Sequence, residues 1–136
     1  MEIERTPTGT VSTWNITTDD YNIKDFVIKN DNDEIIATVC FTSLKPGKST
    51  RGHVDDHNEF YAFMIGIGVM MVDHDLHKID LEDAAYRGDD AHPTVFVKKG
   101  KFHRVFNMSP WKTLNFLSVV PGEVKREPYS QTHDQH

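Results

Sequence analysis

Short runs of β-branched and aromatic residues recur along the chain, separated by Gly, Pro, Asn and Asp. Runs of four to eight such residues with turn residues between them are typical of strands in an all-β sandwich or barrel. No apolar pattern with the period of a helix extends beyond two turns. The pattern therefore predicts an all-β domain, with strands at residues 10–16, 25–30, 34–44, 59–65, 69–73, 77–81, 94–99, 103–107 and 113–120.

The residues between these runs predict the connections. Gly66 and Gly68 interrupt the most apolar stretch, which predicts a tight reversal between two core strands. Residues 81–92 predict a helical turn or a long loop, and the polar residues 123–136 predict a surface tail. No repeat or linker interrupts the 136 residues, so we expect a single domain over 1–136.

Composition limits the class of protein. The net charge of −6 argues against nucleic acid or an anionic membrane as the main partner, because both call for a basic face. The one cysteine, Cys40, cannot form an intramolecular disulfide and is expected to be a buried, inert thiol. The N-terminus lacks the pattern of a signal peptide, and no apolar stretch is long enough to span a membrane. We therefore expect a cytoplasmic protein.

Residues 51–61, RGHVDDHNEFY, gather histidines and carboxylates at the start of the most apolar stretch. Side chains alternate between faces along a strand, so His53 shares a face with Asp55, and His57 shares one with Glu59. A further histidine, His103, follows the turn at residue 100. Imidazole and carboxylate donors suit Fe, Mn, Zn, Ni or Cu better than Ca or Mg. The alternative is a polar turn on an acidic protein that binds no metal.

The order and spacing of these residues resemble the two sequence motifs of the cupin superfamily. The first motif reads Gly47, KSTRG, His53, V, Asp55, DHN, Glu59, FYAFMI, Gly66. The second reads Gly100, KF, His103, RVF, Asn107. The motifs and the strands between them cover residues 35–120. The resemblance implies a single jelly-roll β-barrel of antiparallel strands, with a metal held inside by three histidines and a glutamate.

The resemblance carries over to individual positions. His53, Glu59 and His103 match metal ligands of the family, but Asp55 stands where the family has its second histidine. His57 resembles a third histidine of related sequences, so we favour it as the fourth ligand, with Asp55 or water as alternatives. The implied cofactor is one divalent transition metal: Fe, Mn, Zn or Ni. A cupin fold that binds no metal remains the alternative, because fold alone does not establish function.

Residues 49–61 look like the corresponding stretch of cupin-type phosphoglucose isomerases. That resemblance implies a sugar or sugar-phosphate isomerase or epimerase, with Glu59 or Tyr61 as acid or base. A non-haem iron dioxygenase, a metal-dependent lyase and a non-catalytic small-molecule-binding cupin are the alternatives, and a cationic rim would favour the isomerase. Residues expected to alternate into the barrel mouth include the substrate-binding candidates Arg51, Phe63 and Arg104, together with Phe41, Phe96, Phe106 and Trp111.

The expected partners are a small-molecule substrate and a second copy of the chain. Cupins of this size commonly pair through β-strands, so the resemblance implies a homodimer. The N-terminal run at residues 10–16 is the expected edge or exchanged strand.

Overall fold

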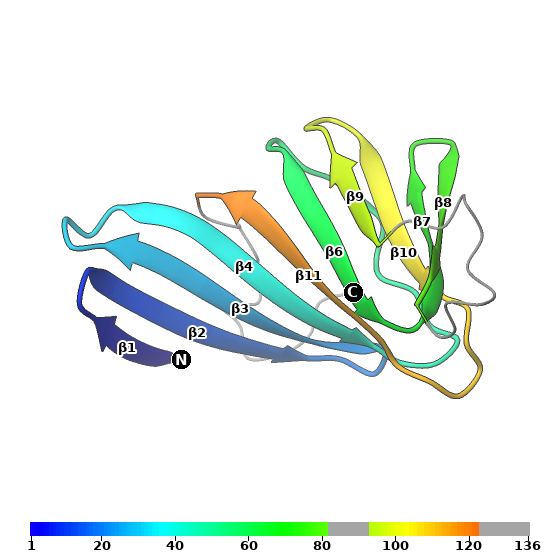
Figure 1. The fold of residues 1–136 in the computed structure, drawn as a ribbon, viewed down its shortest axis with the longest axis horizontal. Helices are drawn as coiled ribbons and strands as arrows, with labels where there is room; N and C mark the ends of the chain where they lie inside the picture. Colours follow the sequence, from blue (N-terminus) through cyan, green and yellow to red (C-terminus); the bar gives the residue numbers. More distant parts are fainter. Residues whose placement is uncertain (82–92, 123–136) are drawn as a thin grey trace.

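The computed structural model describes residues 1–81 and 93–122, which form two antiparallel β-sheets (Figure 1). The larger has seven strands in the order β1-β2-β3-β4-β11-β6-β9, and the smaller has four in the order β5-β10-β7-β8. The strands are β1 (Glu2–Thr6), β2 (Gly9–Thr17), β3 (Tyr21–Asn30), β4 (Ile35–Leu44), β5 (His53–Val54), β6 (Glu59–Ile65), β7 (Ile67–Val72), β8 (Asp75–Asp80), β9 (Thr94–Val97), β10 (Phe102–Asn107) and β11 (Leu114–Pro121).

The all-β prediction is confirmed, and every predicted strand is present. Two strands were missed. β1 mixes acidic and basic residues with a single isoleucine, Ile3, and pairs with β2 alone. β5 has only two residues. Residues 82–92, which hold most of the predicted loop, and the predicted tail at 123–136 lie outside the described residues.

The inner faces of the two sheets share one hydrophobic core. The larger sheet contributes Leu44, Tyr61, Phe63, Leu114 and Phe116, and the smaller contributes Met70, Ile79 and Val105. Cys40 is buried beside this core on β4, as predicted. Strict alternation along β6, β10 and β11 sends every second side chain inward.

Gly66 is the corner at which the chain crosses from one sheet to the other. The sequence predicted a tight reversal between two core strands here, and the two strands that Gly66 joins, β6 and β7, belong to different sheets. Gly66 adopts a φ of 118°, and a Cβ atom there would lie 2.9 Å from the side chain of Leu114 and 3.0 Å from its Cα. The glycine is needed because the backbone turns sharply against a buried strand.

The N-terminal run 10–16 lies inside the sheet. It belongs to β2, which is hydrogen-bonded to β1 on one side and β3 on the other. The predicted role as an edge strand is therefore wrong, because the missed strand β1 occupies that position. Within residues 1–81 and 93–122, no helix is long and apolar enough to cross a membrane.

Candidate metal centre

The candidate site lies where the two sheets meet at one end. His53 on β5 and His103 on β10 are direct partners in the antiparallel register. Glu59 is the first residue of β6, and Asp55 lies in the turn between β5 and β6. The backbone N–H of Gly100 donates to the carbonyl oxygen of Asp55 at 2.8 Å, which ties this turn to the turn between β9 and β10. Two turns and three strands thus position the four side chains.

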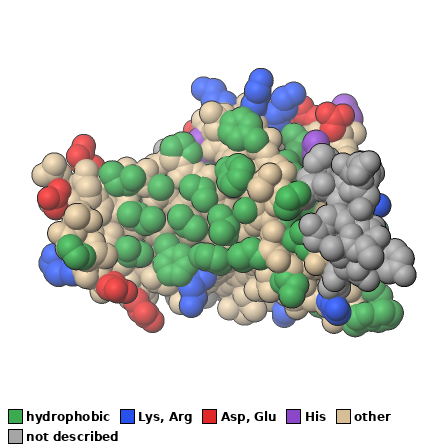
Figure 2. Space-filling view, in the orientation of Figure 1, with side chains coloured by type: hydrophobic (Ala, Val, Ile, Leu, Met, Phe, Trp, Pro, Cys, Tyr) green, Lys and Arg blue, Asp and Glu red, His purple; other side chains and the backbone are tan. Residues whose placement is uncertain are grey.

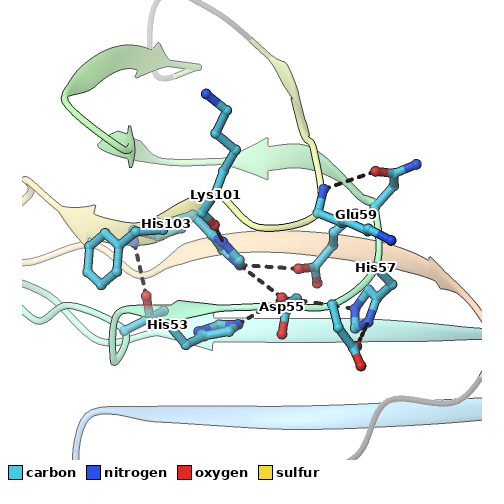
Figure 3. A network of polar contacts seen from close by, with 12 residues as sticks. His53, Asp55, His57, Glu59, Lys101 and His103 are labelled. Atoms are coloured by element: carbon cyan, nitrogen blue, oxygen red, sulfur yellow. Dashed lines mark hydrogen bonds and ion pairs between the residues drawn. The ribbon is translucent and has the colours of Figure 1, made fainter.

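His53, Asp55, Glu59 and His103 each direct one potential ligand atom to a common point, with all four atoms within 4.8 Å of one another (Figure 3). Oδ2 of Asp55 lies 3.1 Å from Nε2 of His53 and 3.2 Å from Nε2 of His103. Oε1 of Glu59 lies 3.3 Å from the same His103 nitrogen. Two imidazoles and two carboxylates in this arrangement could hold a divalent metal.

The orientation of both imidazoles is set by the backbone. Nδ1 of His103 lies 3.1 Å from the carbonyl oxygen of Lys101, and Nδ1 of His53 lies 3.2 Å from that of Arg51. A carbonyl can only accept, so each Nδ1 carries a hydrogen and donates it. Nε2 of each ring then faces the carboxylates, which is the orientation that a metal-binding histidine requires.

Two buried atoms of the cluster are left without a hydrogen-bond partner. Nε2 of His103 and Oε1 of Glu59 approach each other, but the contact lacks hydrogen-bond geometry and both atoms are shielded from solvent. Burying such groups unpaired is costly. A cation bound between them would satisfy both, so the residues present fit a metal.

The electrostatics of the cluster favour a bound positive charge. Burial opposes a charge on His103, but the carboxylates of Asp55 and Glu59 outweigh it and raise the pKa of His103 to about 10. Burial also works to raise the pKa of Asp55, but His103 and His53 outweigh it, and the net shift is well below the ordinary value. In the metal-free chain, a proton on His103 therefore occupies the place of a cation between the two carboxylates.

Access to the cluster is one-sided. The side chains of His103 and Glu59 are 1% and 7% exposed, whereas that of His53 is 48% exposed. Asp55 lies between these extremes. A small molecule would thus approach from the side of His53, with His103 and Glu59 at the buried base of the site.

His57, which the sequence favoured as the fourth ligand, lies outside this group of four. Its Nε2 is 3.9 Å from Oδ2 of Asp55, and its Nδ1 is 3.3 Å from Oδ1 of the exposed Asp56. Asp55, the alternative in the sequence, occupies the position between His53 and His103. The geometry therefore places Asp55 in the cluster and His57 beside it.

Tyr61 and Phe63 follow Glu59 on the inward side of β6, and both are buried. The ring of Tyr61 lies 5.8 Å from that of His103 and is also packed against Phe63 and Phe116. Burial, reinforced by the charge of Glu59, raises the pKa of Tyr61 well above its usual value. Tyr61 therefore stays a neutral phenol, whose hydroxyl can donate a hydrogen bond, and Phe63 is the next inward residue of β6.

The two arginine candidates lie away from the cluster's interior. Arg104 follows His103 directly on β10 and so points to the opposite face of the sheet. Its guanidinium donates to the carbonyl oxygen of Thr50 at 2.9 Å and to Oγ of Ser49 at 2.8 Å, and it stacks over Phe106. Through these contacts, Arg104 holds the segment before β5 in place. Arg51 is exposed on that same segment.

Lysines also stand in the turn between β9 and β10, whose backbone is tied to the turn that carries Asp55, and they were not singled out in the sequence. Lys98 and Lys99 are exposed, and the backbone N–H of Lys99 donates to Oδ1 of Asn58 in the turn that carries Asp55. Lys101 forms an ion pair with Asp73 at 3.1 Å. The stretch VKKGK, residues 97–101, was the available signal, because it forms the turn before the strand that carries His103.

Three comparisons relate the chain to known proteins. No family model matches the sequence, and no curated protein sequence matches it. Among solved structures, it is similar to a cupin-2 domain protein of Rhodospirillum rubrum, with 16% identity and a TM-score of 0.57 over 90% of this chain and 76% of that one. An RmlC-like cupin of Shewanella frigidimarina gives 13% identity and a TM-score of 0.60 over 87% and 89% of the two chains. An oxalate decarboxylase gives 12% and 0.61 over 82% of this chain, but only 28% of its own.

Proposed function

Because this chain has the cupin fold, we propose that it is a metal-dependent enzyme that converts a small anionic or polar metabolite at His53, Asp55, Glu59 and His103. The observation that carries the proposal is the pair of buried, unsatisfied atoms, Nε2 of His103 and Oε1 of Glu59, in the group of four converging ligand atoms. Function is argued from this site, because the fold hosts many activities.

The donor set favours particular metals. Asp55 in place of a histidine gives the site two carboxylates, which neutralise the charge of a divalent ion and are harder donors than imidazole. Mn(II) and Fe(II) are therefore the first candidates, with Zn and Ni after them.

We assign the reaction to the isomerase or epimerase class, with a sugar or sugar phosphate as substrate. A divalent ion in the site would polarise adjacent substrate oxygens. Tyr61, held neutral by burial, would donate a hydrogen bond from its hydroxyl to a substrate oxygen, and the carboxylate of Glu59 would accept the transferred proton. The exposed lysines at 98 and 99 would hold the anionic group, and this pair of cations is what favours the isomerase.

A metal-dependent lyase is the second candidate. The fold is shared with an oxalate decarboxylase, and the same lysine-bearing turn suits a substrate with carboxylates. A non-haem iron dioxygenase differs in consuming oxygen, and a binding cupin differs in producing no turnover. These classes differ in the substrate that they consume and the product that they form, so one set of assays distinguishes them.

Elemental mass spectrometry of untagged protein is expected to find about one divalent transition metal per chain. The loaded protein is then tested on aldose and ketose phosphates, on small dicarboxylates, and in an oxygen electrode. Isomerised sugar phosphate without oxygen uptake would support the first class, released carbon dioxide the lyase, and oxygen uptake the dioxygenase. Metal-free protein that resists reconstitution would contradict the proposal outright.

Metal binding is expected to release about one proton per site and to strengthen with rising pH. His103 keeps its proton up to a pKa of about 10 in the metal-free chain, so the metal must displace it. Affinity should rise by ~10-fold per pH unit between about pH 7 and 9, where this one proton is exchanged. Calorimetry in buffers of different ionisation enthalpy measures the proton count. A pH-independent affinity would show that His103 is already neutral in the free site.

A further inference from the structure

The segment at residues 49–53 runs antiparallel to β10 and holds one residue more than β10 does over the same length. Ser49 stands opposite Phe106, and His53 stands opposite His103. The segment therefore advances four positions while β10 advances three, which makes it a β-bulge. One extra residue reverses the alternation of faces, so the bulge decides the side of the sheet to which His53 points.

Without the extra residue, this histidine would lie on the wrong side of the sheet. A regular ladder continued from Ser49 would place Gly52 opposite His103. His53 would then oppose Phe102, whose side chain lies on the other face of β10. Gly52 leaves room for the observed path, because a Cβ atom there would overlap the ring of Phe102. The bulge thus turns His53 inward, beside His103.

Two side chains complete the hydrogen bonds that the bulge interrupts. The backbone N–H of Thr50 donates to the carbonyl oxygen of Val105 at 2.9 Å, as in a regular ladder. The return bond is replaced by two others at 2.9 Å: the N–H of Val105 donates to Oγ1 of Thr50, and Nε of Arg104 donates to the carbonyl oxygen of Thr50. Arg104 also donates from Nη2 to Oγ of Ser49 at 2.8 Å. The bulge therefore persists without unpaired backbone groups at this point, which would be costly.

His53 depends on its backbone because burial does not hold it. Its side chain is 48% exposed, whereas that of His103 is 1% exposed. Figure 2 shows histidine side chains at the surface among charged groups, at the end of the molecule where β9 turns back into β10. The ring of His53 is oriented by Nδ1, which donates to the carbonyl oxygen of Arg51 at 3.2 Å, and this carbonyl belongs to the bulge. Nε2 of His53 then lies 3.1 Å from Oδ2 of Asp55.

We infer that Arg104 and Thr50 are positioning residues, which together maintain the bulge that directs His53 into the candidate metal centre. The inference rests on the metal centre of the proposed function and assigns a task to two side chains outside the four converging groups. Arg104 suits this task because its planar fork reaches Thr50 and Ser49 together, which the single ammonium of a lysine does not reproduce.

The first test uses metal-free protein and the nuclear Overhauser effect between aromatic rings. The ring centroids of His53 and His103 are 4.3 Å apart, so the wild type should show a strong cross-peak between them. Thr50→Val removes the hydroxyl that accepts from Val105, and Arg104→Lys removes the fork. Each variant should lose this cross-peak. The cross-peak between Tyr61 and His103, whose centroids are 5.8 Å apart, should remain and shows that the core is intact.

The second test is calorimetric titration of the same variants with Mn(II). Thr50→Val and Arg104→Lys should each bind about 10- to 100-fold more weakly than the wild type, as when a residue that supports a ligand is lost. Thr50→Ser keeps the hydroxyl and should bind as the wild type does. Arg51→Lys is the matched control, because the bulge uses only the backbone carbonyl of Arg51.

A double-mutant cycle separates positioning from a general structural role. Combined with His53→Ala, neither Thr50→Val nor Arg104→Lys should weaken Mn(II) binding further, because both act through His53. A merely structural role would lower the affinity by the same factor in either background.

The inference is overturned if the cross-peak between His53 and His103 survives in both Thr50→Val and Arg104→Lys, or if their losses add to that of His53→Ala. Two variants that also lose the cross-peak between Tyr61 and His103 would overturn it as well, because these residues would then hold the fold and not the ligand. A wild type that binds no Mn(II) would contradict the proposed function alone, since the cross-peaks are read without metal and still decide what positions His53.

Discussion

Replacing His103 with alanine is expected to lower the affinity for Mn(II) or Fe(II) by at least ~1,000-fold. This loss is larger than the one expected from removing a residue that only hydrogen-bonds to a metal ligand. His103 is the most buried of the four converging groups, and its Nε2 lies within 3.3 Å of both carboxylates. Its ring is held in place by the backbone, because Nδ1 lies 3.1 Å from the carbonyl oxygen of Lys101 and leaves Nε2 facing the carboxylates. Isothermal titration of the metal into metal-free protein measures the loss.

The matched control is His74→Ala, a histidine exposed in the turn between β7 and β8. It should bind metal as the wild type does. His103→Ala also leaves the carboxylates of Asp55 and Glu59 without a cation between them. In metal-free buffer at neutral pH, this variant should therefore unfold at a lower temperature than the wild type. His103→Ala that retains stoichiometric metal would place the metal elsewhere and remove the candidate centre.

Asp55→Asn is expected to weaken metal binding by at least ~100-fold, whereas His57→Gln should change it by less than about 5-fold. Oδ2 of Asp55 lies within 3.2 Å of both imidazole Nε2 atoms, but Nε2 of His57 is 3.9 Å from that oxygen and Nδ1 turns toward Asp56. The asparagine keeps the shape of the side chain and removes its charge. The comparison therefore isolates the carboxylate as a ligand.

The two variants are titrated side by side with Mn(II) and Zn(II). The carboxylate of Asp55 is a hard donor, which favours Mn(II). Asp55→His should therefore shift the ratio of the two affinities from Mn(II) toward Zn(II) by about 10-fold or more. A larger loss in His57→Gln than in Asp55→Asn would make His57 the fourth ligand, as the sequence favoured. Equal and small losses in both would leave His53, Glu59 and His103 as a three-residue site.

The strands could be predicted because each carries its own signal. Alternating apolar and polar positions with β-branched and aromatic residues specify an extended segment and its buried face without help from distant residues. β4 and β11 were predicted as extended segments in this way, but both carry apolar residues on their two faces, so only the structure shows that Thr38 and Thr42 are buried and Phe41 is exposed. β1 was missed because its side chains pack against no core, and only its pairing with β2 makes it a strand.

The alternation of side chains along a strand also predicts which residues face outward, and the sequence analysis did not apply it to every strand. Arg104 stands one position after His103, and Phe41 one position after the buried Cys40, so both were placed by alternation on the outside. They were expected to line the barrel mouth because of their residue types, and not because of their positions in the alternation along the strand. Phe96, between the buried Val95 and Val97, shows the same point.

The sequence by itself determined most of the strands and the set of residues from which the site is drawn, because these depend on local periodicity and on motif spacing. Only the tertiary structure brought Asp55, and not His57, into the group of four converging side chains. Both lie in a turn, where alternation no longer predicts direction, and the hydrogen bond from Gly100 to Asp55 sets the path of the backbone. The row of outward residues Phe26, Val39, Val119, Phe60 and Phe96 likewise exists only in the folded sheet, because these residues come from five strands that the register aligns.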